Sequence, residues 1–356
     1  MTRLFAMNWF CLLLTASAFG QQGTFTSFVV PGFPATTMTQ AINANGIVTG
    51  YYIDTGRVSH GFIRSANGVI TTFDAPGAGS ENYEGTSATS INDAGAAAGF
   101  YLDTYGAYHG FVREPGGVIS SIDVRGAGTA SYLGTIGVSI NAAGTIAGEY
   151  LDAGSVYHGF VSASGGNITT FDIPGGGSGT FIQAINSAGV VTGFYYDSNH
   201  VAHGFVRSTS GVVTPIDARG AGTANSQGTY AASINDQGTI TGQVTDGNSI
   251  THGFVRSADG AITEFDAPGA GGGPHHATQP FAINAGGTII GTDTEGAGSA
   301  FIRTPNATFT TFDVPVTGAS TVANCINAAA VIAGFYYDLL NEYHGFVMTP
   351  GGDTAK

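Results

Sequence analysis

The sequence predicts an all-β protein of seven similar four-stranded units closed into a ring, and three observations lead to this fold class. An Ile-Asn pair recurs seven times, with its asparagines 43 to 49 residues apart. Each repeat holds four strand-like runs separated by turn sequences. The chain opens with an isolated fourth run and ends after a third run, so residues 23–31 can complete the last unit. These features predict a seven-bladed β-propeller.

Each run of the first unit has its own sequence pattern. The first run ends at Asn43, and a turn follows in which Gly46 is expected to adopt a positive φ. The second run alternates and ends on Asp54, and the third begins at His60. The fourth run ends at Asp74, where a proline stops the ladder because it has no N–H to donate. The same order is expected in every unit.

The repeated motif resembles a known family. Ile-Asn-x-x-Gly, a further Gly four residues later, and His-Gly-Phe before an aliphatic residue resemble the HAF-type probable extracellular repeats. The likeness covers nearly everything after residue 20 and implies export and a repeat fold, but no established reaction. Six copies depart from the family by placing Gly between His and Phe, and the seventh reads Ser299-Ala300-Phe301. The family's leucine-glycine ending is replaced by Phe-Asp-Ala-Pro-Gly-Ala-Gly.

Composition favours a packed protein with a non-anionic partner. The chain has 356 residues, 57 of them Gly, with 42% hydrophobic and 10% charged residues. Hydrophobic residues at a fixed period predict one continuous domain over residues 21–356 rather than disorder. The net charge of −14 repels phosphate backbones, so no nucleic-acid partner is expected. Polyanionic glycans are disfavoured for the same reason.

Residues 1–20 are predicted to be a secretory signal peptide. Arg3 is the only charge, residues 4–16 are apolar, and small residues follow at Ala18 and Gly20. No later stretch is long and apolar enough to span a bilayer. A secreted or periplasmic monomer is therefore expected. Cys325 alone remains after processing, so no intramolecular disulfide can form, and its slot for small residues predicts a buried position.

An Asp and a His flank the loop between the second and third runs of most units. Across a hairpin these side chains lie close enough to interact. They could be metal ligands or acid–base pairs, but six near-identical copies favour a structural clip for each hairpin, because an active site needs one arrangement. The pairs are Asp54/His60, Asp103/His109, Asp152/His158, Asp197/His203, Asp246/His252 and Asp338/His344.

The Asp that ends most fourth runs is interpreted as a turn residue. One carboxylate beside a glycine turn offers too few ligands for Ca²⁺, and an Asx-type turn accounts for it without a metal. No cofactor is predicted, with Ca²⁺ or another divalent metal as the alternative.

The connectors between units differ most, and they share one end of a propeller with the loops between second and third strands. We therefore expect a non-enzymatic module that binds a neutral glycan or an extracellular protein on this face. Aromatic rings would stack and polar groups would hydrogen-bond. The predicted contact residues are Tyr83, Glu84, Tyr132, Gln227, His275 and His276.

The alternative is a propeller-type enzyme, namely a polysaccharide lyase, glycosidase or lactonase. The sixth unit diverges, with a shorter hairpin loop, and carries Glu295 where Asp is expected. His275 or His276 would act as the base, and Glu81, Glu84 or Glu295 would stabilise charge or bind a metal. No nucleophile elbow, phosphate loop or paired-cysteine zinc motif occurs in the sequence.

Overall fold

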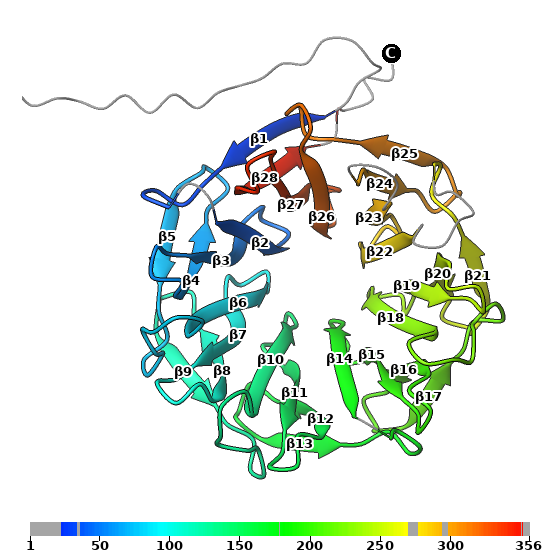
Figure 1. Cartoon of the computed structure of the whole chain (residues 1–356), viewed down its shortest axis with the longest axis horizontal. Coiled ribbons are helices and arrows are strands. Elements are labelled where there is room, and N and C mark those ends of the chain that lie inside the picture. Colours follow the sequence, from blue (N-terminus) through cyan, green and yellow to red (C-terminus); the bar gives the residue numbers. More distant parts are fainter. Residues whose placement is uncertain are drawn as a thin grey trace, which may run out of the picture.

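The described residues form an all-β protein. The computed structural model describes residues 23–33, 36–177, 179–269, 277–293, 298–349 and 351. They contain 28 strands and no helix, and the strands stand around a central opening (Figure 1). Hydrogen bonds join the strands into four sheets of 4, 12, 8 and 4 strands. In this part of the chain no helix suited to crossing a membrane is found.

The strands fall into seven sequential units of four, numbered here from the amino terminus. The first strands, which lie nearest the central opening in Figure 1, are β2 (Thr37–Ile42), β6 (Gly85–Ile91), β10 (Gly134–Ile140), β14 (Thr180–Ile185), β18 (Gly228–Ile234), β22 (Thr278–Ile283) and β26 (Ser320–Ile326). The second strands are β3 (Val48–Ile53), β7 (Ala97–Leu102), β11 (Ile146–Leu151), β15 (Val191–Tyr196), β19 (Ile240–Thr245), β23 (Ile289–Asp293) and β27 (Ile332–Tyr337).

The outer half of each unit is built in the same way. The third strands are β4 (Ser59–Arg64), β8 (Tyr108–Arg113), β12 (Tyr157–Ser162), β16 (Ala202–Arg207), β20 (Thr251–Arg256), β24 (Ala300–Arg303) and β28 (Tyr343–Thr349). The fourth strands are β5 (Ile70–Phe73), β9 (Ile119–Ile122), β13 (Ile168–Phe171), β17 (Val213–Ile216), β21 (Ile262–Phe265), β25 (Phe309–Phe312) and β1 (Thr24–Phe28).

The fourth strand of unit 7 comes from the opposite end of the chain. β1 pairs antiparallel with β28, with Thr24 opposite Thr349 and Phe28 opposite Gly345. The hydroxyls of Ser27 and Tyr336 add a side-chain hydrogen bond of 3.0 Å. The pairing expected between the two ends of the chain is therefore present.

The repeated asparagines link successive units. Asn43 Oδ1 accepts hydrogen bonds from the backbone N–H groups of Asn45 (3.0 Å) and Ile47 (2.9 Å), which closes the turn. Its Nδ2 donates to the backbone oxygen of Asn92, the equivalent residue of the next unit, at 2.9 Å. The same link follows for all seven asparagines, and Asn327 donates back to Asn43 at 3.1 Å. Each Asn thus shapes its own turn and holds the neighbouring unit.

The core is filled by the phenylalanine of the His-Gly-Phe motif. Phe62 and its equivalents in β8, β12, β16, β20, β24 and β28 are at most 1% exposed. The Phe62 ring packs against Gly50, where an added Cβ would lie 2.0 Å from the backbone oxygen of Met38. Only glycine fits there, which accounts for the recurring Gly in the second strands. Burying a Phe side chain contributes roughly 2–3 kcal/mol of stability.

The two ends of each unit carry different loops. The loops between second and third strands hydrogen-bond to the connectors, as where Tyr83 N–H donates to Arg57 O at 3.0 Å. We call this end the connector face. The asparagine turns and the turns between third and fourth strands lie at the other end, which we call the turn face.

Candidate functional site

The His of each third strand in units 1 to 5 lies between two carboxylates. In unit 1, His60 Nε2 lies 3.5 Å from Asp54 Oδ2, and His60 Nδ1 lies 2.8 Å from Asp74 Oδ1. The His60 ring also stacks on Tyr52, with centroids 5.0 Å apart. The Nδ1 atom is therefore held by a carboxylate at hydrogen-bond distance, and Nε2 faces a second carboxylate.

Each of these His residues thus has a second acidic partner besides the predicted loop Asp. In units 2 to 5 the shorter contact, from Nδ1, is again to the Asp that ends the fourth strand. The pairs are His109/Asp123 at 2.7 Å, His158/Asp172 at 2.6 Å, His203/Asp217 at 2.7 Å and His252/Asp266 at 2.7 Å.

The predicted partner makes the longer contact, from Nε2. The pairs are His109/Asp103 at 3.4 Å, His158/Asp152 at 3.5 Å, His203/Asp197 at 3.8 Å and His252/Asp246 at 3.9 Å. The contacts of His203 and His252 with their loop Asp exceed hydrogen-bond distance. The stronger partner was missed because it is 14 positions away from the His on the adjacent strand, so the contact becomes visible only when the strands pair.

In units 1 to 5 the two Asp residues therefore have separate roles. The Asp that ends the fourth strand is a partner of the His and not only a turn residue. The loop Asp shapes its own turn: Asp54 Oδ1 accepts a hydrogen bond from the Val58 N–H at 2.8 Å. That bond holds the pKa of Asp54 below its usual value.

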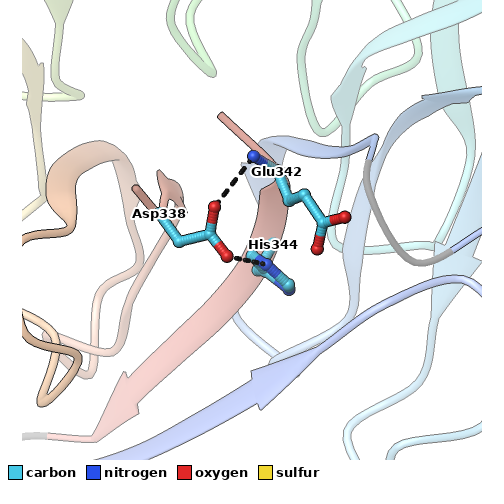
Figure 2. Close-up of side chains that lie close together, drawn as sticks. All are labelled: Asp338, Glu342 and His344. Carbon is cyan, nitrogen blue, oxygen red and sulfur yellow. Dashed lines mark hydrogen bonds and ion pairs between the residues drawn. The ribbon is translucent and has the colours of Figure 1, made fainter. Parts of the chain in front are cut away.

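Unit 7 has a different cluster, shown in Figure 2. Val29 follows β1 where an Asp follows the other fourth strands, so Asp338 and Glu342 are the acidic neighbours of His344. His344 Nε2 lies 3.6 Å from Asp338 Oδ2, and the potential ligand atoms of the three side chains lie within 4.8 Å of one another. Among the described residues this is the one group of three with metal-ligand spacing. One imidazole and two carboxylates form a ligand set suited to a divalent transition metal.

Two predicted contact residues are exposed on the connector face. The side chains of Tyr83 and Tyr132 are 60% and 57% exposed. Both have positive φ, 70° and 62°, which is unfavourable for a bulky residue. Tyr105 lies in the adjoining hairpin loop of unit 2 and is 79% exposed. The Arg57 guanidinium donates to the Tyr83 hydroxyl at 2.9 Å.

Glu84 and Gln227 close their own connectors instead. Glu84 Oε2 accepts a hydrogen bond from the Glu81 N–H at 2.8 Å. Gln227 is 8% exposed, and its Oε1 accepts from the Ala224 N–H at 3.0 Å. The polar groups of both side chains are therefore used within the loop. His275, His276 and Glu295 lie outside the described residues.

A half-exposed aromatic cluster in units 3 to 5 was not predicted from the sequence. The Phe181 ring lies 4.6 Å from Tyr157 and stacks on Phe194 at 5.0 Å. Glu149 on β11 lies beside this cluster and accepts a hydrogen bond from the Ile182 N–H at 2.9 Å. Burial raises the pKa of Glu149 to about 7. The available signal was that Glu149 occupies a slot held by an aromatic residue in four other units.

Two cavities lie on the turn face, away from the connectors. One, of about 270 Å³, lies where the seven asparagine turns meet. The other, of about 460 Å³, lies between units 2 and 3 and is lined by residues of β8, β9, β11 and β12.

Comparison with known proteins identifies the type of fold. No protein-family model and no curated protein match the chain. Among solved structures, virginiamycin B lyase from Staphylococcus aureus has 15% identity and a TM-score of 0.57, over 91% of this chain and 98% of that chain. The BP39L lectin from Burkholderia pseudomallei has 9% identity and a TM-score of 0.55, over 90% and 98%. These likenesses support a β-propeller fold. Since a lyase and a lectin share it, this propeller's fold does not define its function.

Proposed function

We propose that the chain is a seven-bladed β-propeller whose units 1 to 7 are the blades and whose N-terminal strand completes the last blade. The antiparallel pairing of β1 with β28 supports closure. The asparagine links, which return from Asn327 to Asn43, support it independently. In this proposal the chain is a member of the HAF-type repeat family, is exported by the leader at residues 1–20, and works outside the cytoplasm.

We further propose that the propeller is a non-enzymatic module that binds a neutral glycan on its connector face. The observation that carries this proposal is the placement of Tyr83 and Tyr132. Their rings are exposed, so burial does not account for them, and their positive φ disfavours a bulky side chain. Ser226 occupies the equivalent position in another connector, also with positive φ, so the loop does not require an aromatic residue. Exposed tyrosines at a position where another connector has Ser226 are typical of a stacking surface.

The surroundings favour a neutral ligand. The net charge of −14 repels anionic polymers. Exposed apolar residues continue around this face, since Leu339 and Leu340 lie in the hairpin loop of unit 7. Glu84 and Gln227 are left out of the proposed contact surface because their polar groups close the connectors.

The test is retention on insoluble neutral polysaccharides, with cellulose, chitin and xylan as the probes. The double variant Y83A/Y132A should bind at least about fivefold more weakly, because two stacking contacts contribute roughly 1–3 kcal/mol together. Val118→Ala, which removes an exposed side chain beside β9, is the control and should bind like the parent. Failure of all three polymers to retain the protein, or equal retention of the double variant, would refute the proposal. Release of soluble sugar would instead favour the enzyme.

A further inference from the structure

A repeated contact covers the boundary between most neighbouring units. The last Arg of a third strand places its guanidinium over the Phe that ends the fourth strand of the preceding unit. The distances from the Arg Cζ to the ring centroid are 4.8 Å for Arg64 over Phe28, 5.0 Å for Arg113 over Phe73, 4.5 Å for Arg207 over Phe171 and 4.7 Å for Arg303 over Phe265. Such cation–π contacts also cover apolar surface with the Arg stem.

The boundary between units 2 and 3 lacks both partners. Ser162 pairs with Ile146 as Arg113 pairs with Ala97, so Ser162 occupies the Arg position. Ile122 pairs with Gly110 as Phe73 pairs with Gly61, so Ile122 occupies the Phe position. The boundary of units 4 and 5 keeps its Arg, and that of units 6 and 7 keeps its Phe. The cavity of about 460 Å³ lies where both are missing.

The walls of this cavity combine apolar and hydroxyl groups. Val112, Ile122 and Ile146 supply apolar surface, while Ser120 and Ser162 supply hydroxyls. Ser162 is 5% exposed and lines the cavity, and within the described part of the chain its hydroxyl makes no hydrogen bond to another protein group. Water can reach this hydroxyl from the cavity, and a hydroxyl of a ligand would replace that water as its hydrogen-bond partner.

The charge of the cavity walls disfavours an anionic ligand. Glu114 is the one ionisable side chain in the lining, and no Lys, Arg or His contributes to it. An anion would therefore find no counter-charge. The volume lies within the range of small-molecule sites, and a ring with one apolar face and several hydroxyls matches both kinds of wall.

We propose that the groove between units 2 and 3, opened by Ser162 and Ile122 in place of Arg and Phe, binds a single neutral pyranose residue. The proposal deepens the proposed glycan-binding function, and it places a second subsite on the turn face, remote from Tyr83 and Tyr132. Ser162 donates to or accepts from a sugar hydroxyl, and Ile122 packs against the apolar face of the ring.

The experiment is saturation-transfer difference NMR, followed by titration, with the methyl glycosides of glucose, mannose, galactose and fucose as probes. At least one glycoside should bind with a millimolar Kd. S162R/I122F, which restores the covering pair, should weaken that binding at least tenfold. S162A should weaken it about fivefold by removing one hydrogen bond. Since S162A removes only one oxygen, it keeps the test decisive if the double variant fails to fold.

Two controls separate this site from the connector face. Y83A/Y132A should bind the glycoside like the parent, and V118A should do the same. The groove proposal would be overturned if none of the four glycosides binds at about 20 mM, which is on the order of the weakest sugar sites. It would also be overturned if S162A and S162R/I122F bind with unchanged affinity. Polysaccharide retention that depends on the tyrosines would then still support the connector-face proposal. If only the groove variants lose glycoside binding, the groove proposal is supported even when the connector face binds nothing.

Discussion

Replacing Asn43 with Ala should destabilise the protein measurably. The substitution removes three hydrogen bonds, two from the turn N–H groups of Asn45 and Ile47 and one to Asn92 O. Asn43 is buried, so the partners that remain are poorly hydrated. At about 1 kcal/mol for each bond, the expected loss is about 3 kcal/mol. For 356 residues at about 2.1 cal/mol/K each, this lowers Tm by about 4 °C.

Calorimetry with two companion variants separates the turn from the link between units. Asn43→Asp keeps the acceptor for the turn N–H groups but loses the donor to Asn92, so its Tm should fall by roughly a third as much as that of Asn43→Ala. Asn45→Ala, which removes an exposed contact to Asp93 O, should shift Tm by less than about 1 °C. A Tm for Asn43→Ala within about 1 °C of the parent would show that the asparagine links contribute little.

Three further outcomes can be measured directly. Raising the pH from about 4.5 to 7 should lower the stability of the parent protein, because Glu149, whose pKa is raised to about 7, keeps its proton in the folded chain but loses it in the unfolded one. Glu149→Gln should therefore raise Tm at pH 8 and leave it unchanged at pH 4; an equal effect at both would contradict this account. Asp54, whose pKa is lowered, stabilises the fold above the unfolded pKa and loses this effect as the pH falls through its folded value, so Asp54→Asn should flatten the acid end of the Tm–pH curve. Cys325 is buried, and burial raises the pKa of its thiol, so Ellman's reagent should modify it only after denaturation; rapid reaction in the native protein would show that the residue is accessible.

Much of the strand pattern can be predicted from the sequence, because seven variants of one pattern show which positions every unit needs. Gly50 recurs because an added Cβ would collide with the backbone oxygen of Met38, and Phe62 recurs because its ring is buried in the core. Contacts that join different strands or units are harder to predict. The partner of His60 at Asp74 depends on strand register, and the groove at Ser162 depends on a residue of the preceding unit. The sequence did not predict the burial of Gln227, because that burial depends on how the connector folds.

The candidate site was predicted only in part for a related reason. Exposure of Tyr83 and Tyr132 follows from their place in variable connectors, which sequence comparison of the units reveals. The raised pKa of Glu149 follows from burial beside rings contributed by two other strands. A repeat alignment shows that Glu149 is unusual, but it does not show what surrounds the carboxyl group.

The pairing of β1 with β28 also has consequences for how the chain folds and resists force. Ser27 and Tyr336, which meet across this unit, are 309 positions apart. A ribosome must therefore release the whole segment between these residues before unit 7 can be completed, whereas units 1 to 6 have their own strands in sequence. Such long-range contacts slow folding, because the entropy of bringing distant segments together is lost before the contacts form. Under tension applied to the two termini, β1 and β28 are the strands that bear the load first, so unit 7 holds the two ends of the chain together.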